Sequence, residues 1–309
     1  MSGRPSAVPG FCVFAYSDHK PLGQGGICLG DGKLDAERGF LNKWEMYKAL
    51  VGESIGPCRL PETVLYQEPA LASMLSRYGK IYIKTVSGWG GQAVSVLEGH
   101  HGLYRWHRQG QSAIRSRNLR LLAKLISAYY RNHQSIIQQA APLARYQGRP
   151  FDIRVHMQKD ASDGWVYAGE LVRVGGTDAI VSNVAISQGT VLPMEKVLQN
   201  LHLRSGPEQM RWRLQRIGAS IASILNRYRD FNDIGIDLGI SRQGELWLIE
   251  VNTDDAQGAP SYELFAQLPD KKLYEQMKNR ATERNAAIVQ SILQELFGSE
   301  DWTSGADWK

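Results

Sequence analysis

Two short runs near the end of the chain combine strand-like apolar residues with groups that could bind a metal ion. In the segment "DIGIDLGISRQGELWLIEVNTDD", the first run contains Asp237 and the second contains Glu250 and Asn252. Side chains alternate between the faces of a strand, so Glu250 and Asn252 share a face, and a hairpin through "SRQG" would bring Asp237 beside them. A carboxylate inside an apolar run destabilises the fold unless it is neutralised. We expect either a cation between these strands or strand-end acids that meet solvent or an arginine.

A lysine and a glycine-rich loop upstream favour a nucleotide as the partner of these acids. Oxygen donors of this kind suit magnesium, which usually binds through a few carboxylates together with the phosphates of a nucleotide. Lys84 lies in the apolar run "IYIKTV" and is followed by Gly88, Gly90 and Gly91, whose backbone N–H groups could approach phosphate closely. The loop could also be a tight hairpin turn. Neither a P-loop nor a Rossmann glycine motif is present, so those two nucleotide-binding classes are excluded.

Composition places the chain among ordinary globular proteins. It has 309 residues, 43% of them hydrophobic, and a net charge of +5 without a long basic run. We therefore expect no nucleic-acid partner. No run approaches the roughly 20 uncharged residues of a membrane helix, and the N-terminus lacks a signal-peptide pattern, which indicates a cytoplasmic protein without a membrane partner. The three cysteines lack CxxC spacing and are expected to be reduced thiols.

Periodicity and turn residues predict an α+β fold. Strands are expected at "FCVFAY", "KIYIKTV", "AVSVLEG", "SIIQQA", "FDIRVHMQ" and "GWVYAGELVRVG", and in the two runs described above. Helices are expected after an Asn42 N-cap and over residues 115–131, 208–229 and about 271–297. The third of these places Met210, Leu214, Ile217, Ile221, Ile224, Leu225 and Tyr228 on one face, and the last carries Leu273, Met277, Ile288, Ile292 and Leu296.

The order of several short motifs resembles the ATP-grasp enzymes, most closely their endospore coat-associated YheC/YheD-like branch. These motifs are "NKW", "PET", "YIKTVSGWGG", "IIQQA", "FDIRVHMQ", "LVRVG", "SN", "GIDLGI" and "WLIEVN", and they span about residues 40–297. The resemblance implies two α+β lobes that clasp a nucleotide. It implies a short N-terminal region at 1–42, a small lobe with its leading helix, phosphate loop and hinge at 43–142, a large lobe with the magnesium site at 143–298, and a polar tail at 299–309.

The same resemblance implies roles for individual residues. Lys43 and Lys84 are similar to lysines that contact the phosphates of ATP, and Gly88, Trp89, Gly90 and Gly91 to the phosphate loop. The hinge residues that would contact adenine are Gln138, Gln139 and Ala141. The implied magnesium ligands are Asp237, Glu250 and Asn252. The residues near the transferred phosphate are Arg154, Arg173 and Asn183, although Arg154 could instead be a structural partner of Asp152 or Glu170.

The implied activity is an ATP- and Mg²⁺-dependent carboxylate–amine ligase that forms an amide or peptide bond through an acyl phosphate. Its substrates would be a carboxylate and an amine nucleophile, such as an amino acid or peptide. The alternatives are a spore coat-associated structural protein that binds nucleotide without turnover, and a small-molecule kinase. The short N-terminal region suggests that a partner protein, a second copy or a peptide substrate completes the site.

Three details of the sequence leave alternatives open. Asp254 and Asp255 replace a Pro-Gly turn that is common in the family, so the acceptor pocket could differ. Trp89 could be a lid over the ligand or a surface-packing residue. His156 faces the same side of its strand as Arg154, and could assist proton transfer or have a structural role.

Overall fold

Strands and helices form two α+β parts, each built around one sheet, and residues 43–59, which come before the first part in the chain, belong to the second. The computed structural model describes residues 42–87, 93–201, 203, 206–253 and 260–297. All of them belong to one compact unit, residues 32–309. The expected strand at "FCVFAY" and residues Gly88–Gly91 lie outside the described residues. No helix in the described part of the chain is both long and apolar enough to cross a membrane.

The first part is a six-stranded antiparallel sheet with the strand order β2-β7-β3-β4-β5-β6. Its strands are β2 (Thr63–Leu65), β3 (Lys80–Thr85), β4 (Ser95–His100), β5 (Leu103–Arg108), β6 (Ile114–Ser116) and β7 (Ser135–Gln139). Two helices, α2 (Glu68–Tyr78) and α3 (Leu119–Tyr130), pack on it through Leu71, Leu122 and Ile126, all of which are fully buried. The predicted β3–β4 hairpin is therefore confirmed.

The second part is a seven-stranded sheet with the order β1-β13-β12-β9-β10-β11, in which β8 pairs with β9. Its strands are β1 (Cys58–Arg59), β8 (Arg145–Tyr146), β9 (Arg149–Lys159), β10 (Trp165–Val174), β11 (Thr190–Leu192), β12 (Asp233–Ile240) and β13 (Leu246–Thr253). Its helices are α1 (Lys43–Leu50), α4 (Val184–Ser187), α5 (Met194–Gln199), α6 (Pro207–Leu225), α7 (Lys272–Phe297) and the 3-10 helix η1 (Ser261–Gln267). The predicted hairpins β9–β10 and β12–β13 are both present.

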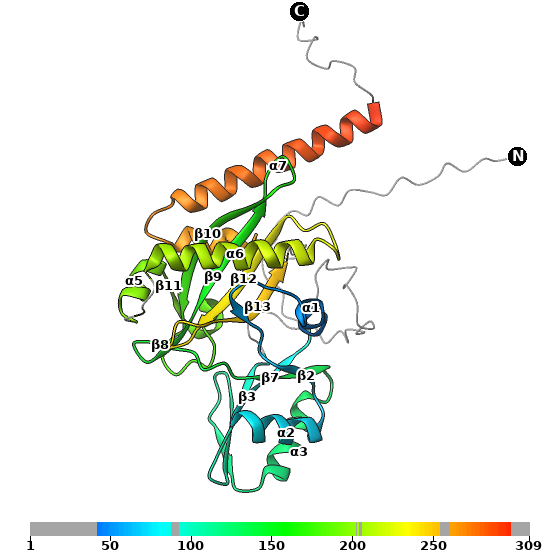
Figure 1. Ribbon diagram of the computed structural model, residues 1–309. Coiled ribbons are helices and arrows are strands. Elements are labelled where there is room, and N and C mark those ends of the chain that lie inside the picture. The colour runs from blue at the N-terminus through cyan, green and yellow to red at the C-terminus, as the bar shows by residue number, and fades with distance from the viewer. Residues whose placement is uncertain (1–41, 88–92, 202, 204–205, 254–259, 298–309) are drawn as a thin grey trace, which may run out of the picture. The chain divides into compact units, whose positions relative to one another are not determined.

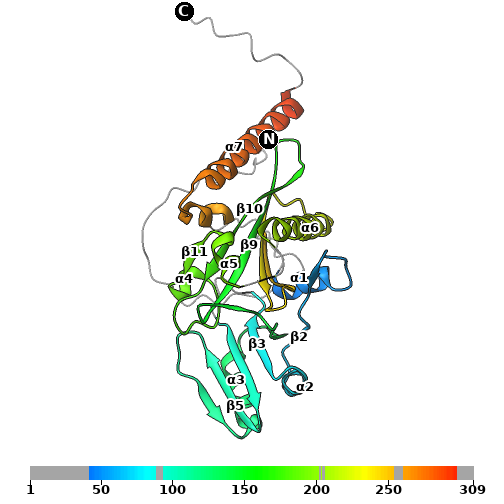
Figure 2. The ribbon, with the colours of Figure 1, turned by 60° about the vertical axis from the view of Figure 1, so that its left-hand side comes forward.

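The two faces of this second sheet differ in chemistry, because side chains alternate along each strand. On β9, Ile153, Val155 and Met157 join the large apolar core under α1, α5 and α6. Arg154 and His156 point to the opposite face, which η1 and α7 partly cover. Figures 1 and 2 show α6 and α7 on opposite sides of strands β9 and β10. The polar face is the one that carries the chemically active side chains.

A β-bulge at Ile249 determines which face of the sheet carries the side chain of Glu250. Asp237 pairs with Glu250, whereas the next residue, Leu238, pairs with Leu248, so Ile249 is an extra residue on β13. Leu246 and Leu248 belong to the apolar core, and the bulge turns Glu250 to the polar face. A bulge is a common device for re-aiming a side chain next to a functional site.

The predicted apolar faces of two helices require correction. In α6 the other residues of the predicted apolar face, from Met210 to Leu225, are buried as expected, but Tyr228 lies beyond the end of the helix and is 52% exposed. In α7 only the first half packs on the sheet, through Leu273 and Met277. The residues expected to extend that face, Ile288, Ile292 and Leu296, are exposed.

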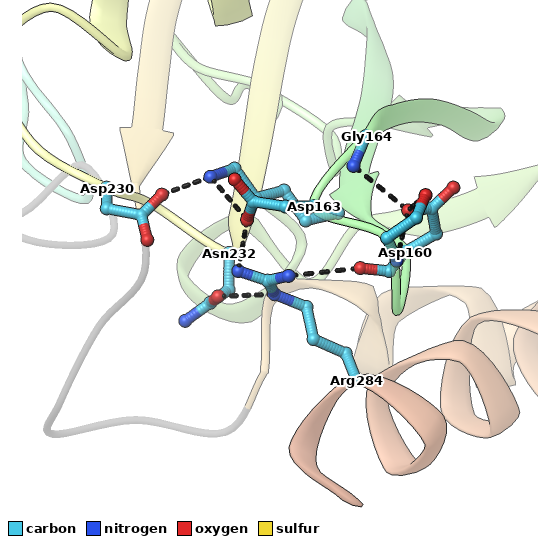
Figure 3. A network of polar contacts seen from close by, with 8 residues as sticks. Asp160, Asp163, Gly164, Asp230, Asn232 and Arg284 are labelled. Carbon is cyan, nitrogen blue, oxygen red and sulfur yellow. Dashed lines mark hydrogen bonds and ion pairs between the residues drawn. The ribbon is translucent and has the colours of Figure 1, made fainter. Parts of the chain in front are cut away.

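A polar network anchors α7 to the β9–β10 hairpin. Arg284 donates to Asn232 Oδ1 (2.8 Å), to the carbonyl of Asp160 (3.0 Å) and to Asp163 Oδ1 (2.7 Å), as Figure 3 shows. Lys159, which is 1% exposed, donates to the same Asp163 oxygen (2.9 Å) and to Asp230. The network holds α7 against the polar face of the sheet.

We expect Arg284→Met to lower the free energy of unfolding by about 2 kcal/mol, because the half-buried carbonyl of Asp160 and the carboxylate of Asp163 lose a charged donor. Urea denaturation measures the change. Lys278→Met on the exposed side of the same helix is the matched control, and its effect is expected to stay within about 0.5 kcal/mol. Equal effects of the two substitutions would show that the network does not anchor the helix.

Candidate active site

The polar ends of β12 and β13 bring the three predicted metal-binding residues together. Asp237 and Glu250 are directly opposite each other in the antiparallel pair, and Asn252 is opposite Gly235. Asn252 Nδ2 lies 3.3 Å from Asp237 Oδ2. All three side chains line one narrow cavity of about 80 Å³. The hairpin inferred from the sequence is therefore correct, and its acids converge.

Two arginines from neighbouring strands neutralise Asp237. Arg154 Nη2 on β9 donates to Asp237 Oδ2 (3.1 Å), and its Nε donates to the other carboxylate oxygen. Arg173 Nη2 on β10 contacts Asp237 Oδ2 at 2.7 Å and also binds Asp152 in a bidentate pair, with both distances 2.8 Å. The alternative pairing of Arg154 with Asp152 or Glu170 is wrong, because the side chain of Arg154 is directed to Asp237.

Burial and neighbouring charges shift the pKa values of Asp237, Asp152 and Arg173 in opposite directions. Burial alone would raise the pKa of Asp237, but Arg154 and Arg173 hold it below its ordinary value. Burial also raises the pKa of Asp152, and this effect prevails over the attraction of Arg173. The pKa of Arg173 is raised because Asp152 and Asp237 outweigh the effect of burial. Arg173 therefore stays charged between two carboxylates.

Two lysines complete the cavity. Lys43, at the start of α1, forms an ion pair with Glu250 (Nζ–Oε1 3.0 Å). Lys84, on β3 of the first sheet, is 8% exposed and donates to Gln138 Oε1 at 2.7 Å. Burial lowers the pKa of Lys84 from 10.5 to about 8, although Glu250 opposes this shift. Burial would raise the pKa of Glu250, but Lys43 and then Lys84 lower it below its ordinary value.

The lining of the cavity has an excess of positive charge. Its walls carry four cations against three carboxylates, namely Lys43, Lys84, Arg154 and Arg173 against Asp152, Asp237 and Glu250. The hydroxyl of Ser182 donates to Asp152, and Asn183 lies beside it on the wall. Residues from both sheets line the cavity, so it lies where the two sheets adjoin. Such a constellation suits a polyanion that brings its own cation.

The predicted adenine-binding residues do not line this cavity. The side chain of Gln138 binds Lys84 and Thr63, and Gln139 Oε1 accepts from the backbone N–H of Glu62. Ala141 is likewise absent from the lining. The phosphate-loop residues Gly88, Trp89, Gly90 and Gly91 lie outside the described residues. Their roles remain proposals.

Sequence reasoning missed Asp152 and Ser182 as members of the site. Asp152 is two residues before Arg154 and therefore shares its face of β9, which is the signal that could have revealed it. Ser182 reaches the site from a loop, and its position depends on tertiary structure alone. Thr85, next to Lys84, also lines the cavity.

The donor set fits magnesium that arrives together with phosphate. Among the described residues, no cluster of three or more acids, histidines or cysteines is placed to hold a metal. The cavity instead offers two carboxylates, Asp237 and Glu250, and the amide of Asn252. Magnesium commonly binds through one or two carboxylates and completes its shell with water and substrate phosphates. Asp237, Glu250 and Asn252 would hold it here.

We expect Lys84→Met to stabilise the ligand-free protein at neutral pH. Because the folded pKa is below the unfolded one, the unfolded chain binds the proton more tightly, and stability rises as pH increases from about 8 to 10.5. The charged lysine thus costs on the order of 3 kcal/mol at pH 7. Urea unfolding at pH 7 and pH 10 should show a stabilising effect at pH 7 that mostly disappears at pH 10.

The matched control is Lys80→Met, since Lys80 lies on the same strand in an exposed pair with Glu98. The same effect of Lys84→Met at both pH values would contradict a depressed pKa.

In parallel, Lys84→Met should weaken ATP binding about tenfold or more, because a charged hydrogen bond to phosphate contributes roughly 1.5 to 3 kcal/mol. Unchanged affinity in titration calorimetry would return Lys84 to a structural role.

The α+β architecture and the motif order both agree with one class of protein, the ATP-grasp proteins. The sequence model of the family described as "YheC/D like ATP-grasp" matches residues 35–287 of the chain. The chain therefore belongs to the YheC/D-like ATP-grasp family, and the family resemblance inferred from the sequence is confirmed.

Two curated relatives come from Bacillus subtilis (strain 168). Endospore coat-associated protein YheD is 25% identical over 224 residues, which cover 69% of this chain and 48% of YheD. Endospore coat-associated protein YheC is 22% identical over 224 residues, covering 70% of this chain and 60% of YheC. The chain thus spans about half the length of these relatives.

Solved structures with related folds include D-alanyl-alanine synthetase A from Vibrio cholerae and D-cycloserine synthetase DcsG. The first is 14% identical, with a TM-score of 0.46, over 82% of this chain and 65% of that one. The second is 13% identical, with a TM-score of 0.48, over 82% of this chain and 70% of that one.

Proposed function

We propose that the chain is an ATP-dependent ligase that joins a carboxylate to an amine through an acyl phosphate, with ADP and phosphate as products. The observation that carries the proposal is the cavity in which four buried or half-buried cations face three carboxylates. Phosphoryl transfer depends mainly on positioning and on neutralising the charge that develops on the transferred group. Lysines and arginines held by ion pairs meet both needs without a covalent enzyme intermediate.

The reaction divides the charged residues by position. Lys43 and Lys84 contact the phosphates of ATP, while Arg154 and Arg173, with Asn183, face the phosphate being transferred. The substrate carboxylate attacks the γ-phosphorus, the bond to the β–γ bridging oxygen breaks, and ADP leaves. The amine then attacks the acyl carbon, and inorganic phosphate leaves with the former carboxylate oxygen.

Magnesium bound by Asp237, Glu250 and Asn252 would supply neutralisation of the phosphate charge. Arg154 and Arg173 already hold the Asp237 carboxylate in place, and the lowered pKa of Asp237 keeps it ionised. Asn252, through its contact with Asp237, limits how the two side chains can turn. The residues are therefore prepared for a cation before the nucleotide binds.

A structural role in the spore coat, with nucleotide bound but not turned over, is the second candidate. The names of the two relatives, both endospore coat-associated proteins, support it, and they favour association with an endospore coat over a purely cytoplasmic location. The cavity argues for turnover, because a buried Lys84 with a depressed pKa destabilises the fold, and a scaffold gains nothing from that. A small-molecule kinase would use the same phosphate contacts and would differ only in the group that keeps the phosphate.

The test is ATP-dependent trapping of the acyl phosphate. The protein is incubated with ATP, Mg²⁺, hydroxylamine and a mixture of common amino acids and dipeptides as carboxylates, and hydroxamates are identified by mass spectrometry. A ligase forms ADP in an amount equal to the hydroxamate and amide together, and neither product nor ADP forms in EDTA. A phosphorylated compound that is stable to hydroxylamine would identify a kinase. Bound ATP without any turnover would favour the structural role.

A further inference from the structure

A second and larger cavity adjoins the narrow one on the same polar face. Its volume is about 550 Å³, and Arg154 and Asn252 line both cavities. This volume lies within the usual range of small-molecule sites and exceeds what a single small amino acid requires. The shared arginine and asparagine place the two cavities next to each other at the position assigned to the transferred phosphate.

The walls of the large cavity come from the polar face of the sheet and from the two helices that cover it. Residues of β9, β12 and β13 form one side, and those of η1 and α7 form the other. The network in Figure 3 fixes α7 in this position, with Arg284 and Asn232 on the cavity wall. Thr253, 7% exposed, also lines the cavity, and its hydroxyl lacks a hydrogen-bond partner among the described residues. A bound polar group would satisfy that hydroxyl.

At one wall, a histidine is hydrogen-bonded to an aspartate through one ring nitrogen and to a serine through the other. His156 Nε2 lies 2.7 Å from Asp233 Oδ1, and His156 Nδ1 lies 3.2 Å from Ser261 Oγ. The imidazole is completely buried and packs against the rings of Tyr262 and Phe265 at 5.9 and 6.0 Å. Ser261 and Asp233 line the cavity. The three residues come from η1, β9 and β12.

The direction of these hydrogen bonds follows from what each group can donate. An ionised Asp233 only accepts, so Nε2 carries the hydrogen of the neutral ring. Nδ1 is then an acceptor, and the hydroxyl of Ser261 donates to it. This leaves the lone pairs of Ser261 Oγ available to accept a proton from a group in the cavity. The arrangement follows the logic of a Ser-His-Asp triad with the two ring nitrogens exchanged.

The serine, histidine and aspartate lie close to the phosphate end of the site. His156 and Arg154 are two residues apart on β9, so they share a face and are separated by roughly 7 Å along the strand. Arg154 points to the narrow cavity, and His156 lies behind the wall of the large one. An amine in the large cavity could thus face both the acyl carbon and Ser261.

We propose that Ser261, His156 and Asp233 form a proton relay that activates the amine nucleophile in the large cavity. This inference rests on the proposed ligase function. The ammonium form of the nucleophile first passes one proton to Ser261 Oγ, whose own proton passes to His156 Nδ1, and Asp233 stabilises the resulting imidazolium. The neutral amine then bonds to the acyl carbon, the C–O bond to phosphate breaks, and phosphate leaves with its electron pair and takes the second proton from nitrogen. The size of the cavity favours an amino acid or short peptide as the nucleophile.

A comparison of two nucleophiles distinguishes a proton relay through Ser261 from a purely structural role of this residue. An amino acid is an ammonium at neutral pH and requires a base, whereas hydroxylamine is largely neutral and attacks without one. Wild-type protein and Ser261→Ala are incubated with ATP, Mg²⁺ and the common amino acids and dipeptides as carboxylate donors, with and without added hydroxylamine, and both amide and hydroxamate are measured. We expect Ser261→Ala to lower kcat for amide formation about 100-fold, the range for a lost general base, and to change hydroxamate formation less than about threefold.

Three further variants sharpen the comparison. Ser261→Thr keeps the hydroxyl and should restore amide formation, and His156→Gln should behave like Ser261→Ala. Ser127→Ala is the matched control, because this serine also makes side-chain hydrogen bonds but lies on α3, outside both cavities. Equal loss of amide and hydroxamate in Ser261→Ala, or a raised KM with an unchanged kcat, would overturn the relay.

Absence of hydroxamate from the wild-type protein would instead contradict the ligase function. The relay is then decided without turnover, by ¹⁵N NMR of the histidine-labelled full chain. We expect an Nε2-protonated tautomer for His156 and a shift of its Nδ1 resonance in Ser261→Ala. An Nδ1-protonated tautomer, or an Nδ1 resonance unaffected by Ser261→Ala, would overturn the relay.

Discussion

Replacing Glu250 by glutamine is expected to lower magnesium-dependent ADP formation at least about 100-fold while the protein stays folded. Glutamine has the same shape and can still accept a hydrogen bond from Lys43, which lies 3.0 Å from Glu250 Oε1. It cannot supply the negative charge that the site offers to a cation, and loss of one such electrostatic group typically lowers turnover 100- to 1,000-fold. ADP release and the thermal midpoint of unfolding measure the two parts of the prediction.

Glu245→Gln is the matched control for this variant. Glu245 is at the turn end of the same hairpin and forms an ion pair with Arg59, away from the cavity. Its replacement should leave ADP formation within about twofold of the wild type, since exposed pairs contribute little. Similar rates in the wild type and Glu250→Gln would remove Glu250 from the mechanism.

Replacing Arg173 by methionine is expected to produce the largest loss of stability. Arg173 is 5% exposed and neutralises both Asp152 and Asp237, so its removal leaves buried carboxylates with too few cations. Breaking a buried ion pair in this way typically costs about 3 to 5 kcal/mol. Urea denaturation should show this loss at pH 7. The loss should become smaller at acid pH, because the raised pKa of Asp152 favours its neutral form.

A second substitution tests this explanation. Asp152→Asn in the Arg173→Met background removes a charge that has lost its partner, and should recover part of the stability. Arg59→Met, which breaks an exposed pair with Glu245, should change the free energy of unfolding by less than about 1 kcal/mol. A loss for Arg173→Met no larger than that for Arg59→Met would contradict the burial argument.

Much of the fold followed from local patterns in the sequence. The hairpins β3–β4, β9–β10 and β12–β13 were predicted because strands with alternating residues are separated by short polar or glycine-rich turns. The same hairpin predicted that Asp237 lies within reach of Glu250 and Asn252, whereas its direct pairing with Glu250 depends on the bulge. Asn42 caps α1 as predicted, since its side chain accepts from two backbone N–H groups of the first turn.

Other features depend on contacts that no local pattern encodes. The apolar stripe of α7 was correctly assigned to a helix, but periodicity does not say how far a neighbour covers it, and Ile288, Ile292 and Leu296 are exposed. The bulge at Ile249 inserts one residue without a distinctive sequence. Asp152 joins Arg173 only because β9 and β10 pair in one register.

The hydrogen-bonded serine, histidine and aspartate illustrate the same limit. The sequence predicts that His156 shares a face with Arg154, but it leaves the role of His156 open between proton transfer and structure. Asp233 lies on the neighbouring strand, and Ser261 is more than 100 positions away from His156 in the chain. Only the packing of η1 over the sheet brings the three together.

Transfer of ¹⁸O from the substrate carboxylate to inorganic phosphate tests the central claim most directly. The full chain is incubated with ATP, Mg²⁺ and a mixture of ¹⁸O-carboxylate-labelled amino acids and dipeptides, and the phosphate is analysed by mass spectrometry. An acyl phosphate intermediate predicts one ¹⁸O atom in each phosphate released, together with an amide product. Phosphate without ¹⁸O would mean that water attacked ATP, and would contradict the assignment of the cavity to carboxylate activation.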